Sequence, residues 1–146
     1  MFPEGWTQLG AGRTASGLDP RVSVDSARGV TFVPAQHVRG LLYQDVDDEA
    51  EIAELAAGLV PQSLAPGWCA STYAAWRWMP TTYVVTRGDT EEMVAAQEWI
   101  VKSAVENVPN AIDKVVRRDV GHCPFWSQTE WTAALLIEEA ERSVEP

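Results

Sequence analysis

His122 is the residue of this sequence whose type and position best suit acid–base chemistry. The 146-residue chain contains only two histidines, and this one lies in the segment VVRRDVGHCPFW (115–126), where a β-like run ends. Gly121 and Pro124 bend the chain around it. An imidazole titrates close to neutral pH and can accept a proton during a reaction. We therefore predict a general base just beyond the C-terminal end of a strand.

Asp89 is the carboxylate that we expect to be the partner of His122. It ends the segment TTYVVTRGD (81–89), a second β-like run. If the two runs form adjacent parallel strands, their C-terminal ends meet at one edge of a sheet, where chemistry gathers in such folds. A carboxylate beside a histidine fixes the imidazole tautomer and stabilises the imidazolium, as in a nucleophilic triad. An aspartate at this position could alternatively only cap the following helix.

Two strands and two helices are expected to position this pair. The run TTYVV has the nearly continuous apolar character of a buried parallel strand, and Thr90 can cap a helix that extends to about Asn107. The more charged run AIDKVVRRDV (111–120) predicts an edge strand. This alternation implies a parallel strand pair with a right-handed crossover.

The last helix is predicted to begin at a capping box. Ser127 stands three residues before Glu130, which is the spacing of that motif. The helix then extends to about Glu141 and is expected to bury four apolar residues, Trp131, Leu135, Leu136 and Ala140.

The first half of the chain has a different character. The runs RVSVD (21–25) and GVTFV (29–33) alternate like two short strands of a hairpin. Short helices are expected over AQHVRGLLYQ (35–44), from about Asp48 to Leu59, and over CASTYAAWRWM (69–79), and we read residues 1–20 as a loop. Such elements suit a region that covers a core better than they suit the core of a sheet.

Composition excludes several classes of function. The net charge of −10 argues against a nucleic-acid partner, which needs a basic face, and against an anionic membrane surface. No apolar run approaches the roughly 18 residues of a membrane span, and MFPEGWTQLG has no signal-peptide pattern. Two cysteines make no disulfide framework. We expect a cytoplasmic protein that uses neither nucleic acid nor a membrane.

The segments MPTTYVVTRGD and GHCPFWSQTEW, separated by one helix and one strand, resemble the C-terminal half of an α/β-hydrolase. The resemblance is to the branch that contains small esterases and hydroxynitrile lyases. In that branch the histidine is commonly followed by a small residue, proline and phenylalanine, and then by a serine-led last helix. The segments LLYQDV, EAEIAELAAGLVPQS and AAWRWMPTTY resemble its helical cap, so the resemblance extends from about residue 40 to the end.

This resemblance implies a partial α/β-hydrolase fold. Residues 1–78 would form a cap-like region with a small hairpin and short helices, and residues 79–146 the C-terminal portion of the core, with a β-α-β-α order. Asp89 would be the triad acid and His122 the triad base. The family's nucleophile is a serine on a G-x-S-x-G elbow, and this sequence contains no such motif. We therefore expect a truncated hydrolase that lacks the nucleophile-bearing half.

The expected function is a carboxylic-ester or amide hydrolase that is inactive alone, with a small ester or amide as substrate once the nucleophile is supplied. The alternative is a non-catalytic module that binds a ligand or a partner chain. Because the strand TTYVV would lack one sheet neighbour, self-association through its exposed edge is expected in either case.

The remaining candidate residues have simpler interpretations. Trp126 and Phe125, beside the histidine, could line an apolar substrate pocket. Cys123 is expected to be a small packing residue, since neighbours in sequence point in different directions, and His37 has no partner at ligand spacing. We predict no metal and no cofactor: there is no H-E-x-x-H and no paired cysteine motif, and the glycines at 10, 12 and 17 neither follow a strand nor precede G-K-[ST].

Overall fold

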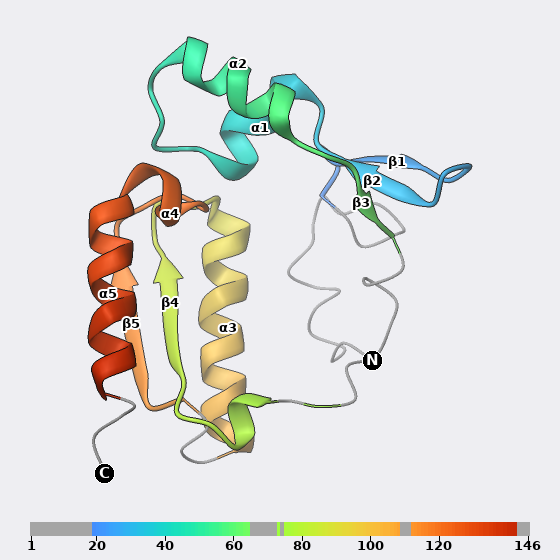
Figure 1. Cartoon of the computed structure of the whole chain (residues 1–146). Helices are drawn as coiled ribbons and strands as arrows, with labels where there is room; N and C mark the ends of the chain where they lie inside the picture. The colour runs from blue at the N-terminus through green and yellow to red at the C-terminus, as the bar shows by residue number, and fades with distance from the viewer. Residues whose placement is uncertain (1–18, 65–72, 74, 109–111, 143–146) are drawn as a thin grey trace.

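The computed structural model describes residues 19–64, 73, 75–108 and 112–142, and it has a mixed α/β fold. The hairpin and two helices come first, and a parallel strand pair with its helices follows (Figure 1). In chain order the elements are β1 (Ser23–Asp25), β2 (Val30–Phe32), α1 (Ala35–Leu42), α2 (Glu49–Gly58), β3 (Gln62–Ser63), the 3-10 helix η3 (Ala75–Arg77), β4 (Thr82–Thr86), α3 (Glu91–Asn107), β5 (Lys114–Arg118), α4 (Pro124–Ser127) and α5 (Thr129–Arg142).

The predicted hairpin is confirmed, and a third strand joins it. β1 and β2 are antiparallel with Val24 opposite Thr31. Gly29 has a φ of +66° in the turn, a conformation that glycine adopts without strain. β3 pairs antiparallel with β2 and was not predicted, because a two-residue strand has no periodicity to read.

The helices α1 and α2 confirm the predictions over 35–44 and 48–59, and they pack around a small core. Asp48 caps α2 by accepting a hydrogen bond from the backbone N–H of Ala50. The core contains Val38, Tyr43, Val46, Ile52 and Cys123. Because Cys123 lies next to His122 in the chain, this core connects the helical region to the loop that carries His122.

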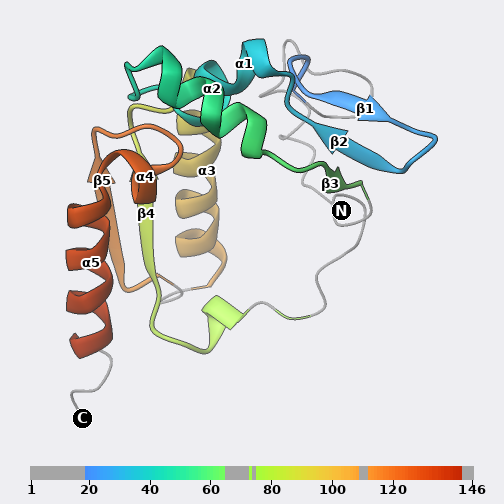
Figure 2. The same ribbon diagram turned by 45° about the horizontal axis from the view of Figure 1, so that its top comes forward.

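The parallel strand pair is also confirmed, with Val84 of β4 opposite Val116 of β5. Thr90 caps α3 by accepting a hydrogen bond from the backbone N–H of Met93. In both views β4 and β5 lie between α3 and α5, and their C-terminal ends point toward α1 and α2 (Figures 1 and 2). The edge where the predicted acid and base lie is therefore the edge that faces the helical region.

The last helix is confirmed as α5, but its predicted capping box and part of its predicted packing were wrong. Ser127 ends α4, and its hydroxyl donates a hydrogen bond to Asp45 Oδ2 instead of capping α5. Leu136, which was expected to be buried, is 65% exposed, and Ala140 is exposed too. Trp131 and Leu135 are half-buried. Glu139 of α5 also accepts hydrogen bonds from Lys114 of β5 and from Thr82 of β4.

Two predictions concern residues that the structure describes only in part or not at all. The loop expected over 1–20 lies outside the described residues except for its last two. Of the helix expected over 69–79, the structure describes residues 73 and 75–79, which contain the 3-10 turn Ala75–Arg77. None of the helices in the described ranges is long and apolar enough to cross a membrane.

Candidate active site

Asp89 and His122 meet at the C-terminal ends of the two parallel strands. Asp89 Oδ2 lies 2.7 Å from His122 Nδ1. Beyond the strand ends, the backbone N–H of Gly88 donates to the carbonyl of Val120, so the two loops run side by side. A Cβ on Gly88 would lie 2.9 Å from the carbonyl carbon and oxygen of Val120. Glycine at position 88 thus permits the approach that joins acid and base.

The Asp89 side chain is fully buried and accepts hydrogen bonds on both oxygens. Oδ1 accepts from Gln44 Nε2 at 2.9 Å and from the backbone N–H of Thr90 at 2.7 Å. Oδ2 accepts from His122 Nδ1 and, at longer distances, from the side chains of Gln97 and Thr86. A buried carboxylate is tolerated only with such partners. Its contact with the backbone N–H of Thr90, the N-cap of α3, also places it in the positive field of that helix.

The His122 ring is oriented so that one nitrogen faces the acid. Its side chain is 35% exposed. The hydrogen bond to Asp89 raises the pKa of His122 above its usual value, and the Coulombic attraction of the carboxylate adds to this, whereas burial opposes it. Because a carboxylate can only accept, Nδ1 carries a proton and Nε2 of the neutral ring is the basic atom. The pair can therefore remove a proton from a hydroxyl group presented to Nε2.

Gln44 and Asp45 belong to this site, and the sequence interpretation missed them. Both lie in the loop between α1 and α2. Besides its bond to Asp89, Gln44 accepts a hydrogen bond through Oε1 from the backbone N–H of His122. Asp45 Oδ2 accepts from the backbone N–H of Gly121 at 2.8 Å. No local pattern marks these residues, because their partners lie 45 to 78 positions away along the chain.

Gln97 was also missed, although its sequence position carried a signal. Its amide accepts from the backbone N–H of Thr86 and donates to the Thr86 hydroxyl and to Asp89 Oδ2. Gln97, Thr86 and Asp89 are the buried polar residues of the described chain. A glutamine between Ala96 and Val101, on the apolar face of α3, indicates a buried polar partner.

The two predicted pocket residues have different surroundings in the structure. Trp126 Nε1 donates a hydrogen bond to Glu51 Oε1 at 2.6 Å, and the ring lines a cavity of about 280 Å³ against α2, together with Tyr43 and Leu55. Phe125 is 60% exposed. Of the two residues, Trp126 lines this cavity and Phe125 does not.

Cys123 is buried in the core of the helical region, as expected for a packing residue. Burial, followed by the nearby carboxylates of Asp89 and Asp45, raises the pKa of its thiol. A raised pKa keeps the thiol protonated and unreactive. Among the described residues, no hydroxyl or thiol group donates a hydrogen bond to His122 Nε2.

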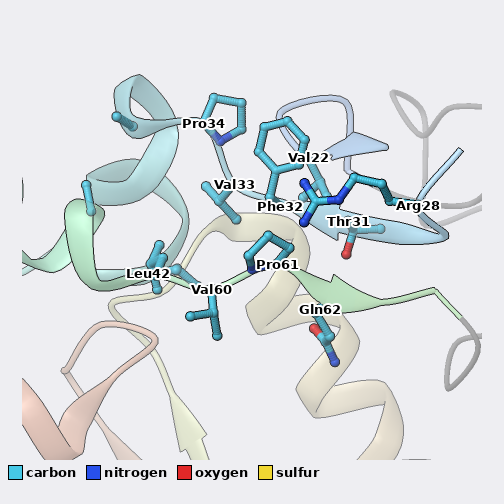
Figure 3. Close-up of a pocket in the computed structure, with 13 residues that line it drawn as sticks. Val22, Arg28, Thr31, Phe32, Val33, Pro34, Leu42, Val60, Pro61 and Gln62 are labelled. Carbon is cyan, nitrogen blue, oxygen red and sulfur yellow. The ribbon is translucent and has the colours of Figure 1, made fainter. Parts of the chain in front are cut away.

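A cavity of about 660 Å³ lies away from the pair, between the hairpin and the helices (Figure 3). Apolar side chains such as Phe32, Leu42 and Val60 line most of it, and Arg28 and Gln62 add polar groups. Neither Asp89 nor His122 lines it, so it is separate from the acid–base pair. In the described ranges, no three histidine, cysteine, aspartate or glutamate residues group as metal ligands.

Two comparisons with known proteins found no match. No protein-family model matches the chain, and no curated protein matches it. The geometry of Asp89 and His122 is therefore the basis on which the function is argued.

Proposed function

We propose that this protein contributes the acid and the base of a Ser-His-Asp mechanism of the α/β-hydrolase type, acting on carboxylic esters or amides. One observation carries the proposal. A fully buried aspartate hydrogen-bonds a partly exposed histidine at 2.7 Å, at the C-terminal ends of two parallel strands. This geometry has the histidine orientation that the mechanism requires, with one ring nitrogen held and the other available.

Each residue has a defined role in this mechanism. His122 Nε2 takes the proton of a serine hydroxyl as the serine oxygen attacks the carbonyl carbon of the substrate. Asp89 keeps the ring in the Nδ1–H tautomer and stabilises the imidazolium. The imidazolium then donates its proton to the departing alcohol or amine, and an acyl-enzyme remains. His122 next deprotonates a water molecule that attacks the acyl-enzyme, and it then returns this proton to the serine oxygen as the carboxylic acid product leaves.

The serine must come from a polypeptide segment other than this one, because the sequence contains no G-x-S-x-G elbow. We expect the purified 146-residue chain to hydrolyse p-nitrophenyl acetate no faster than its His122→Ala variant, measured by release of p-nitrophenolate. Turnover by the chain that disappears in His122→Ala would contradict the proposed dependence on an external serine.

The coding DNA allows a second test, in which hydrolysis is expected. If the coding DNA upstream of Met1 contains an in-frame strand–G-x-S-x-G–helix segment, the extended protein should hydrolyse the ester. Asp89→Asn should then lower kcat by about 10⁴-fold, the magnitude typical of losing the triad acid, and His37→Ala should leave it unchanged. An extended protein whose kcat is unaffected by Asp89→Asn would refute the assignment.

Partner binding is a second candidate function, and the open edge of β4 favours it. Within the described part of the chain β4 pairs with β5 alone. Thr81 and Arg87 direct backbone groups toward β5, so the alternation of a strand directs those of Thr82, Val84 and Thr86 to the opposite edge. There the N–H of Thr86 bonds to Gln97. An unpaired apolar edge can add a strand from another chain.

Val84→Pro tests this edge selectively, because it removes an N–H that faces away from β5. Sedimentation velocity at increasing protein concentration should show association of the wild type and less association of the variant. The control, Val85→Pro, removes an N–H on the β5 side and should weaken folding itself, seen in its urea midpoint. A monomeric wild type at all concentrations would contradict self-association through β4.

A further inference from the structure

A single side chain of the helical region contacts both members of the acid–base pair. Gln44 Nε2 donates to Asp89 Oδ1 at 2.9 Å, and Gln44 Oε1 accepts from the backbone N–H of His122 at 2.9 Å. The two ends of one planar amide therefore set the position of the carboxylate relative to the backbone that carries the imidazole. In the described chain no other side chain hydrogen-bonds both residues in this way.

Asp45, the residue after Gln44, contacts the loop that carries His122. Its Oδ2 accepts hydrogen bonds from the backbone N–H of Gly121 at 2.8 Å and from the Ser127 hydroxyl at 2.7 Å. A Cβ on Gly121 would lie 2.6 Å from Asp45 Oδ1 and 2.9 Å from Gln44 Oε1. The loop that carries His122 is thus packed closely against the Gln44–Asp45 dipeptide.

Buried residues flank the Gln44–Asp45 dipeptide on both sides. Tyr43 before it and Val46 after it are both buried, at 8% and 6% exposure. They belong to the core that also contains Cys123, the residue after His122. Side chains held by such a core supply the precise support that reacting groups need, since small displacements lower rates strongly.

We infer that Gln44 is a positioning residue for the Asp89–His122 pair, through which the loop between α1 and α2 controls the orientation of the acid and the base. The inference rests on the proposed function of that pair. By donating to Oδ1, Gln44 leaves Oδ2 directed at His122 Nδ1. By accepting from the His122 backbone, it keeps the ring within reach of that oxygen.

The test uses Gln44→Met, which preserves the length of the side chain and removes both hydrogen bonds. The readout is NMR of the 15N-labelled imidazole. In the wild type we expect a slowly exchanging, strongly downfield Nδ1–H signal from His122 and the Nδ1–H tautomer when the ring is neutral. In Gln44→Met we expect loss of that signal and a shift of the neutral ring toward the Nε2–H tautomer.

Two further variants make the result decisive. Gln36→Met is the matched control, since Gln36 is exposed on α1, and it should leave the His122 spectrum unchanged. Gln44→Asn keeps the amide but is one methylene too short to contact both groups. It should reproduce the loss of the signal, and it replaces the methionine variant if that variant does not fold.

The outcomes separate this inference from the function on which it rests. A folded Gln44→Met or Gln44→Asn variant that retains the wild-type Nδ1–H signal and tautomer overturns the role of Gln44 and leaves the pair intact. A wild type that lacks the Nδ1–H signal refutes the Asp89–His122 pair itself.

Discussion

Asp89→Asn is expected to destabilise the protein and to remove the elevation of the His122 pKa. The carboxylate is fully buried and accepts from Gln44 and Thr90 on one oxygen, and from His122 on the other. An asparagine has only one acceptor oxygen, so its NH₂ group must face one of these two sets of donors and leave those donors without an acceptor. Each donor left unpaired in the interior costs about 1–3 kcal/mol, so we expect a large loss in the free energy of unfolding, measured with urea.

The same variant should change the dependence of stability on pH. In the wild type the folded-state pKa of His122 is raised above its usual 6.5. The stability that this shift contributes is complete below the unfolded-state pKa and is lost as pH rises through the folded-state pKa. Without the carboxylate, burial remains and lowers the pKa of His122. The decline in stability above about pH 6.5 should therefore disappear in Asp89→Asn.

Urea unfolding between about pH 5 and pH 9, with NMR titration of the His122 ring, measures both effects. His122→Ala should show the same flattened pH profile, while His37→Ala should retain the wild-type profile. A His122 pKa that stays raised in Asp89→Asn would mean that another group controls the ring.

Gly88→Ala is expected to separate the two strand ends. The added Cβ would lie 2.9 Å from backbone atoms of Val120, and backbone atoms cannot rotate away as a flexible side chain can. Overpacking of this kind costs about 1–3 kcal/mol. Because Gly88 lies next to Asp89, the shift should also lengthen the contact with His122 and weaken its effect on the histidine pKa.

Gly58→Ala is the matched control. Gly58 ends α2, and apart from its chain neighbours and the backbone of its own helix, no atom lies within 4 Å of the position that a Cβ would take there. Since alanine favours helix by up to about 1 kcal/mol over glycine, the control should be neutral or slightly stabilising. Thermal and urea unfolding compare the two variants. Equal stability of Gly88→Ala and Gly58→Ala would contradict the close approach at Val120.

Some of the site could be predicted because it depends on periodic patterns and chain order. The parallel pairing of β4 and β5 follows from strands separated by a helix, and pairing in this direction places Asp89 beside His122. The helix starts at Asp48 and Thr90 also follow from local chemistry, since a cap bonds to a backbone group within three residues. These features depend on contacts between residues close in sequence, or on the order of strands and helices along the chain.

The errors at the start of α5 have a different origin. Ser127 has the spacing of a capping box, yet its hydroxyl bonds to Asp45, which lies in the helical region. Leu136 has the spacing of a buried face but is exposed, while Glu139 of the same helix bonds to Lys114 and Thr82 of the strand pair. A local pattern cannot show that a distant group competes for the same side chain.

The sequence by itself determined the strand, helix, strand and final helix of the second half, the placement of Asp89 and His122 at one edge of the strand pair, and the absence of a G-x-S-x-G elbow. Only the tertiary structure decided what surrounds the pair. Gln44 reaches Asp89 and His122 across 45 and 78 positions of sequence. Contacts over such separations depend on how the helical region packs against the strand ends, and no spacing along the chain encodes that packing.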